Sequence, residues 1–293
     1  MKKSEKLTAI KGYNLMKESS IAICSIVRDC NRSLKRNIPI IEKLRANFKS
    51  SFIIIFENDS KDDTKLTLKN WSKNSDNVIV KCETLNEVTI LKHTTGKVNK
   101  YFSDYRISKM ATFRNQYMSV LQELQNKFDY IIVVDLDIEK FYLDGIAHSF
   151  GLADQWDSVS SYGYSYSPFL RKRYHDSYAL TELGDNLNPQ NEETIINNQI
   201  KWSFLKPGLP LIPVYSGFGG LAIYKYNAIK DKKYLAIKNN DPRVEVRCEH
   251  YSICHQMHKD NHTRVFINPN MRLLYQRISF SLIKKFIIQK LLH

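Results

Sequence analysis

The stretch FDYIIVVDLDIEKF, residues 128–141, predicts a buried β-strand that ends on two carboxylates. Its apolar run is continuous rather than alternating, which is typical of a parallel strand covered on both faces. Because side chains two positions apart in a strand point to the same face, Asp135 and Asp137 are expected to project together. Two neighbouring carboxylates repel each other, so the pair indicates a cation between them. The alternative is that the aspartates cap the next helix.

The segments around this strand predict the fold class. Apolar runs at 20–29, 51–60 and 77–84 resemble the strand at 128–141, and segments with helical spacing follow at 34–48 and 105–128. This alternation predicts an α/β fold with a mostly parallel sheet flanked by helices. Such sheets bind ligands beyond the carboxyl ends of their strands. Polar segments stand at three of these ends: IVRDCNRS, FENDSKDDT and VVDLDIEKF.

The composition of the chain indicates which binding partners and which cellular compartment to expect. The 293 residues include 44 Lys+Arg and 30 Asp+Glu, and the net charge of +14 favours an anionic partner such as a nucleic acid, a phosphorylated small molecule or an acidic membrane. The five cysteines form no C-x-x-C pair, which suits a reducing compartment. No apolar segment resembles a secretory signal or approaches the ~18 residues of a membrane span. We therefore expect a cytoplasmic protein.

The two ends of the chain differ from its middle. Residues 1–18 are expected to form a loose basic leader, 19–276 a single domain, and 277–293 a basic amphipathic tail. If the tail is helical, Phe280, Ile283, Ile287 and Leu291 lie on one side, which suits an anionic membrane surface or packing on the domain or a partner. Residues 156–181, rich in Tyr, Ser and Arg, are expected to form a surface loop.

Two other functions are compatible with parts of this pattern. Haloacid-dehalogenase-like phosphatases also end a buried strand on Asp-x-Asp, and Asp135 would then be the nucleophile. That motif requires Thr or Val two residues beyond the second Asp, where this chain has Glu139, and it sits near the start of its domain. A basic nucleic-acid-binding protein would explain the charge and the Tyr-rich segment 162–178, but no nucleic-acid-binding motif accompanies them.

Five segments together resemble the GT-A glycosyltransferases. They are FENDSKDDT, ATFRNQYM, YSGFGGLAIYKYNAI, RCEHYSICHQM and RVFINPNMRLLY, and they occur in this order around the D-x-D strand. The order and spacing are similar to the branch of fungal capsule α-1,3-mannosyltransferases and related bacterial polysaccharide or lipopolysaccharide glycosyltransferases, over about residues 20–275. The resemblance implies a metal-dependent transfer of a sugar from a UDP- or GDP-sugar to a glycan or lipid-linked glycan acceptor.

The resemblance also implies roles for individual residues. Asp135 and Asp137 would hold Mn²⁺ or Mg²⁺ at the diphosphate, with His250 completing the metal shell and Asp137 catalytic through the metal. Arg114 would face the diphosphate or brace the aspartates, and Glu249 would be the general base or orient the acceptor. The residues implied around the donor are Arg28, Glu57, Asn58, Ser60 and Asp62 at the nucleotide and Gly219, with Gly217 and Gly220, at the sugar.

Two departures from the pattern leave the nucleotide undetermined. Many relatives have two acids where this chain has Glu57-Asn58, and Asp63 stands where Gly is usual. The residues His250, Cys254, His258 and His262 recur every four positions, but one straight helix cannot wrap four ligands around a zinc ion.

Overall fold

The computed structural model describes residues 3–124, 128–167, 170–276, 278, 283–284 and 287–288. Its α-helices are α1 (Lys3–Glu18), α2 (Asn31–Arg45), α3 (Thr64–Asn74), α4 (Asp104–Glu123), α5 (Leu143–Phe150), α6 (Glu192–Lys201), α7 (Tyr226–Ile229) and α8 (Glu249–Lys259). Its strands are β1 (Ser20–Val27), β2 (Ser50–Asn58), β3 (Val78–Glu83), β4 (Tyr130–Val134), β5 (Lys140–Phe141), β6 (Ser158–Tyr166), β7 (Lys172–Tyr174), β8 (Ile212–Pro213), β9 (Leu221–Lys225) and β10 (Val265–Leu274). Two 3-10 helices, η1 (Asp185–Leu187) and η2 (Trp202–Phe204), flank α6.

One sheet runs through the molecule in the order β3-β2-β1-β4-β9-β6-β10-β5. Strands β3, β2, β1 and β4 are parallel, β9 runs antiparallel to both β4 and β6, and β10 is parallel to β6. The predicted α/β fold class is therefore confirmed. The parallel pairing is confined to β3-β2-β1-β4 and to β6–β10, because β9 reverses direction between them.

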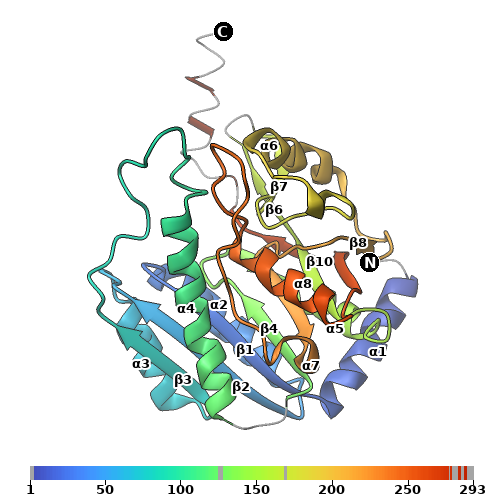
Figure 1. The fold of residues 1–293 in the computed structure, drawn as a ribbon. Helices are drawn as coiled ribbons and strands as arrows, with labels where there is room; N and C mark the ends of the chain where they lie inside the picture. The colour runs from blue at the N-terminus through green and yellow to red at the C-terminus, as the bar shows by residue number, and fades with distance from the viewer. Residues whose placement is uncertain are drawn as a thin grey trace.

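Helices cover both faces of the sheet (Figure 1). Apolar side chains of α1, α2, α3 and α5 pack on one face, and those of α4, α7 and α8 pack on the other. The burial of neighbouring residues such as Ile131 and Ile132 shows why β4 has a continuous apolar sequence, since alternate side chains enter different cores. Helix α4 begins at the N-cap Ser103, whose side chain accepts a hydrogen bond from the Arg106 amide.

The prediction of a loose leader is wrong for residues Lys3–Glu18, which form α1 and pack along α5. Ala9 and Met16 are buried, and glycine allows the two helices to approach closely. A Cβ atom at Gly12 would lie 1.6 Å from the Ala147 carbonyl oxygen. The segment appears polar in sequence because only a narrow stripe of small and apolar residues makes the contact.

The prediction of a surface loop at 156–181 is also wrong, since β6 lies inside the sheet between β9 and β10. Its serines are buried without loss of hydrogen bonds, because Ser160 donates to the Phe266 carbonyl at 3.2 Å and Ser161 to the Gly219 carbonyl at 2.8 Å. Tyr162 and Tyr174 stack in the core with ring centroids 5.9 Å apart. Tyrosine and serine are therefore core residues here.

The predicted amphipathic tail 277–293 lies outside the described residues, apart from Ile278, Ile283, Lys284, Ile287 and Ile288. Among the helices that the structure describes, none has the length and apolar character needed to cross a membrane.

Candidate active site

A cavity of about 590 Å³ opens beyond the carboxyl ends of β1, β2 and β4. Helix α4 supplies one wall, and the opposite wall comes from the segment around β7, the start of α8 and the end of β10. The cavity-lining residues that were predicted as site residues are Arg28, Asn58, Arg114, Asp135, Asp137, Glu249 and His250. The structure thus brings these seven residues together around one cavity at the polar strand ends.

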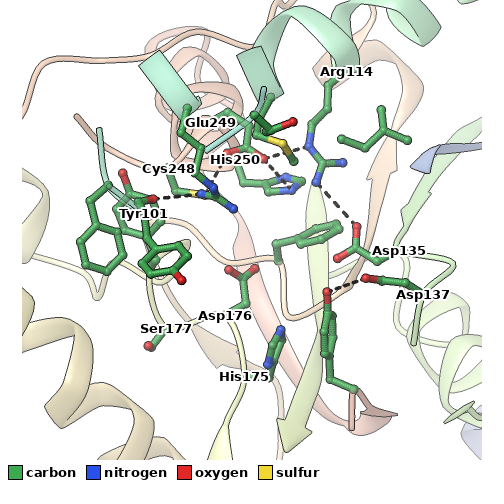
Figure 2. A pocket seen from close by; sticks show the side chains of 18 of the residues that line it. Tyr101, Arg114, Asp135, Asp137, His175, Asp176, Ser177, Cys248, Glu249 and His250 are labelled. Carbon is green, nitrogen blue, oxygen red and sulfur yellow. Dashed lines mark hydrogen bonds and ion pairs between the residues drawn. The ribbon is translucent and has the colours of Figure 1, made fainter. Parts of the chain in front are cut away.

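Asp135 and Asp137 project into this cavity from the turn after β4 (Figure 2). The backbone of this turn is fixed by the side chain of the buried Asn37, which donates to the carbonyls of Leu136 at 2.9 Å and Ile138 at 2.8 Å. The Asp135 amide donates to the Gly220 carbonyl at 2.9 Å, and the Tyr275 hydroxyl donates to Asp137 Oδ2 at 3.2 Å. The two carboxylates are therefore fixed by the backbone and by neighbouring elements.

The charge of this aspartate pair fits a divalent cation. Burial raises the pKa of both carboxyls, and the repulsion between Asp135 and Asp137 raises the pKa of Asp135 further, against the lowering effect of Arg114. A cation between the two would keep both ionised. In the described part of the chain no group of three or more His, Cys, Asp or Glu side chains is arranged to hold a metal. Two oxygen ligands suit Mg²⁺ or Mn²⁺, which keep waters and substrate phosphates in their remaining positions.

Arg114 links the aspartates to the other wall of the cavity. Its side chain is buried, its Nε donates to Glu249 Oε1 at 2.9 Å, and its NH2 lies 3.6 Å from Asp135 Oδ1. The guanidinium also lies over the rings of Phe218 at 5.2 Å and Tyr234 at 5.8 Å. Arg114 therefore contacts Asp135 and Glu249 together, and its predicted roles at the diphosphate or as a brace of the aspartates stay predictions.

Glu249 lies at the start of α8 and is an ion-pair partner of Arg114. Against the effect of burial, the charge of Arg114 lowers the pKa of Glu249. Burial and then Arg114 hold the pKa of His250 well below its usual value, so His250 is neutral and Arg114 supplies the positive charge. A general base works best with a pKa near the operating pH, so this geometry favours a bracing role for Glu249 over the predicted role as base.

His250 lines the cavity but its ring lies flat against Phe218, with the ring centroids 3.6 Å apart. Its nearest carboxylate oxygen is Glu249 Oε1, 3.7 Å from Nε2. The described residues do not bring His250 into a three-ligand group with Asp135 and Asp137. Its assignment as a metal ligand stays a prediction.

The residues predicted around the donor divide into two groups. Arg28 and Asn58 line the cavity, and Arg28 NH1 donates to the Glu87 carbonyl at 3.2 Å and to Thr89 Oγ1 at 3.1 Å. Glu57, Ser60 and Asp62 do not line it.

These three side chains instead hold the loops that follow β1 and β2. Glu57 Oε1 accepts the Ser60 amide at 2.8 Å, and Ser60 Oγ accepts the Asp29 amide at 3.0 Å. Asp62 Oδ2 accepts the Asn31 amide at 3.0 Å, at the start of α2. Their predicted contacts with the nucleotide therefore stay predictions, and the structure gives them an architectural role.

Gly219 also lies beside the cavity rather than in it. Its φ is +63°, and a Cβ atom there would lie 2.3 Å from the Ser161 carbonyl oxygen, so the position needs glycine to pack against β6. Its amide donates to Asp176 Oδ2 at 3.3 Å. The glycine thus positions a carboxylate, and its predicted approach to a sugar stays a prediction.

Asp176 is a cavity residue that the sequence reasoning missed. It has a φ of +65°, a left-handed conformation that is strained for a residue other than glycine. Burial and then the charge of Glu249 raise the pKa of Asp176 to about 7. It forms no ion pair with any described residue, whereas Asp135 and Glu249 both contact Arg114. The expectation of a surface loop at 156–181 concealed it.

The sequence matches the family model described as Cryptococcal mannosyltransferase 1 over residues 21–260. The chain belongs to this family. The predicted membership of a glycosyltransferase family is therefore confirmed. A search of curated proteins found none that matches this sequence.

Solved structures of glycosyltransferases show a loose likeness to this member of the mannosyltransferase family. A mannosyltransferase from Pyrobaculum calidifontis, PcManGT, in complex with GDP-Man and Mn²⁺, is 11% identical, with a TM-score of 0.47 over 92% of this chain and 65% of that one. TarS 1-349 from S. aureus is 11% identical, with a TM-score of 0.47 over 92% and 63%. The chain thus spans slightly less than two thirds of each of these two structures.

Proposed function

We propose that the protein is a metal-dependent glycosyltransferase that moves a sugar from a nucleotide-diphosphate donor to a glycan or lipid-linked glycan. We place this transfer in the assembly of a surface polysaccharide or lipopolysaccharide. The observation that carries the proposal is the pair Asp135 and Asp137, fixed at the end of β4 in a cavity that Arg28 and Arg114 also line. Family membership favours glycosyl transfer over the phosphatase and nucleic-acid-binding alternatives.

Asp135 and Asp137 would hold the divalent cation and thereby the donor diphosphate. When bound, such a cation neutralises the charge that develops on the leaving group. Arg114 lowers the pKa of Asp135 against the stronger effect of burial and, through Glu249, links Asp135 to α8. Arg28 and Asn58, which line the cavity at the ends of β1 and β2, would contact the nucleotide.

Asp176 is the carboxylate that we assign to the acceptor. It lines the cavity, its Oδ2 is oriented by the Gly219 amide, and it forms no ion pair with a described residue. In an inverting transfer it would accept the proton of the acceptor hydroxyl, and in a retaining transfer it would hold that hydroxyl in place. The assignment replaces Glu249, whose Oε1 accepts from Arg114.

Calorimetric titration with UDP, GDP and CMP, each with and without Mn²⁺, tests this function. We expect one nucleotide to bind only with the metal, and Asp137→Asn to abolish that binding. Asp154→Asn is the matched control, because its side chain is 69% exposed and is not part of the cavity lining. A nucleotide affinity that is the same with and without Mn²⁺, and the same in the Asp137→Asn variant, would refute the proposed metal site.

A second variant tests the acceptor carboxylate. Asp176→Asn should keep metal-dependent nucleotide binding and lose sugar transfer.

A further inference from the structure

Helix α6 and the turn η2 carry large apolar side chains that the protein does not cover. Ile196, Ile200 and Phe204 are 56%, 60% and 73% exposed, and their spacing of four residues places them along one side of the segment. Two more exposed apolar side chains precede the helix, Leu183 at 55% and Leu187 at 87%. We call these five residues the apolar face of α6.

Hydrogen bonds tie the segment before α6 to the end of that helix. Glu182, next to Leu183, accepts hydrogen bonds from Lys201 Nζ at 2.7 Å and from Trp202 Nε1 at 2.9 Å. These bonds place Leu183 beside the carboxyl end of α6. Single exposed apolar residues are common on proteins, but a continuous apolar patch marks an interaction site.

The same helix borders the cavity. Ile195 and Gln199 of α6 line the cavity, and Ile195 is 3% exposed. The residues next to them in sequence, Ile196 and Ile200, belong to the apolar face. Helix α6 therefore separates the cavity from the apolar face, and a molecule on that face lies at the edge of the proposed acceptor side.

Cations without carboxylate partners lie next to the apolar face. Lys172 Nζ lies over the rings of Tyr162 at 4.6 Å and Tyr164 at 4.7 Å, and the Arg272 guanidinium lies over Tyr164 at 5.2 Å. The Tyr162 hydroxyl donates to the Ser203 carbonyl in η2 at 2.9 Å, which places this cluster next to η2.

No described carboxylate forms an ion pair with Lys172 or Arg272, and the exposed Lys206 follows Phe204 by two residues. Two of the acids in this region are already neutralised, since Glu182 pairs with Lys201 and Glu192 with Arg243. Apolar side chains beside unpaired cations match a lipid interface, which offers acyl chains together with phosphate groups.

We propose that the apolar face of α6, together with Lys172, Lys206 and Arg272, is the surface by which the protein lies on an anionic phospholipid membrane. The cavity edge formed by α6 then faces the membrane, and the acceptor that reaches it is a lipid-linked glycan. Only this last statement rests on the proposed function, because binding to a membrane does not require catalysis.

Cosedimentation of the full chain with vesicles tests the proposal. The vesicles consist of phosphatidylcholine alone or of phosphatidylcholine mixed with phosphatidylglycerol. We expect preferential binding to the mixed vesicles, and we expect the combined variant Ile196→Ser, Ile200→Ser, Phe204→Ser to bind them at least about tenfold more weakly. Lys172→Gln combined with Lys206→Gln should reduce the preference for the anionic lipid.

The matched control is Leu7→Ser, Ile10→Ser, Leu66→Ser, whose side chains are 60%, 56% and 58% exposed on α1 and α3. This control should bind vesicles as the unmodified chain does. Nucleotide binding by calorimetry reports whether each variant is folded and tests the proposed function separately.

Three results would overturn the proposal. The first is that the unmodified chain does not bind the mixed vesicles. The second is that the α6 variant binds them with the same affinity as the unmodified chain. The third is that light scattering finds a dimer that the α6 variant converts to a monomer, which would make the apolar face a contact between two copies.

Discussion

At the level of single residues, Arg114 determines how the charges of the cavity are balanced. It is 3% exposed and contacts Asp135 on one wall and Glu249 on the other. A buried charge whose partner is removed is costly, because water cannot replace the lost contact. An interaction between Arg114 and the aspartates was predicted from the sequence, but the contact with Glu249 could not be, because Arg114 and Glu249 are 135 positions apart.

We expect Arg114→Gln to destabilise the fold by about 3–5 kcal/mol, because it leaves the buried Glu249 and the partly buried Asp135 without their cation. Lys11→Gln is the control, since Lys11 Nζ lies 3.9 Å from Asp154 Oδ1 and the two side chains are 68% and 69% exposed. That exposed pair should contribute about 0–1 kcal/mol. Denaturant unfolding monitored by circular dichroism measures both variants. Equal losses would contradict the role given to Arg114.

The polar residues near the strand ends differ in where their side chains turn. A sequence does not specify which side chains of a loop turn inward. Glu57, Ser60 and Asp62 bond to backbone amides of the loops after β1 and β2, while Asp176 is turned into the cavity by a left-handed backbone conformation. Such a conformation is rare for aspartate, so residue type and spacing gave no sign of it.

At the level of elements, Asp59 holds the chain that leaves β3. It has a φ of +53°, its Oδ1 accepts the amides of Leu85 and Asn86 at 2.7 and 2.8 Å, and its Oδ2 accepts the Glu87 amide at 3.3 Å. Against burial, the Asn58 side chain and these amides lower the pKa of Asp59 to about 2. The segment 85–87 is therefore tied to the end of β2, next to Arg28, which bonds Glu87.

This pKa predicts the pH dependence of the segment. A carboxyl whose pKa is lowered on folding stabilises the fold above its ordinary pKa and loses that effect as the pH falls through the folded value. The protection of amides 85–87 from hydrogen exchange, relative to their intrinsic exchange rates, should therefore be high above about pH 4 and fall towards pH 2. Asp59→Asn tolerates the same φ and keeps an acceptor oxygen, so its amide protection should be lower at pH 7 and change less with pH. An identical pH profile in both proteins would rule out this role.

The contact between α1 and α5 gives a second test at this level. Replacing a helical glycine with alanine usually stabilises a helix by about 1 kcal/mol. At Gly12 the added Cβ would meet the Ala147 carbonyl, so we expect Gly12→Ala to destabilise the protein by about 1–3 kcal/mol. Asn14→Ala, at an exposed position of α1, should be neutral or stabilising in the same thermal unfolding assay. A stabilising Gly12→Ala would mean that α1 is not packed on α5.

For the whole molecule, the part of the fold that is built from neighbouring segments could be predicted from sequence. Strands β1 to β4 with their intervening helices follow local hydrophobic patterns. The second half of the sheet depends on pairings between distant segments, such as β6 with β10 and β4 with the reversed β9. Hydrophobic periodicity reports on a strand and its faces, but not on its partners or its direction. Beyond β4, the strand order and directions were therefore not predicted.

The reactivity of the cysteine thiols tests how tightly the elements of the fold pack together. The structure has free thiols at all five cysteines, and Cys24, Cys30, Cys248 and Cys254 are buried on different elements, while Cys82 is partly exposed. Burial raises the pKa of the Cys82 thiol and, more strongly, of the others. With Ellman's reagent we expect the native protein to react slowly at Cys82 alone and all five thiols to react after denaturation. Rapid reaction in a Cys82→Ser variant would contradict this packing.

Two separate portions of the sequence line the cavity. In the sheet, the antiparallel strand β9 lies between β4 of the first portion and β6 of the second. Residues 26–137 supply the wall that we assign to the donor, and residues 165–275 supply the wall that we assign to the acceptor. Recombination near β6 would therefore exchange acceptor preference while keeping donor preference. The Arg114–Glu249 pair crosses this boundary. Any chimera of two family members must inherit both halves of that pair, or supply another counter-charge, to remain folded.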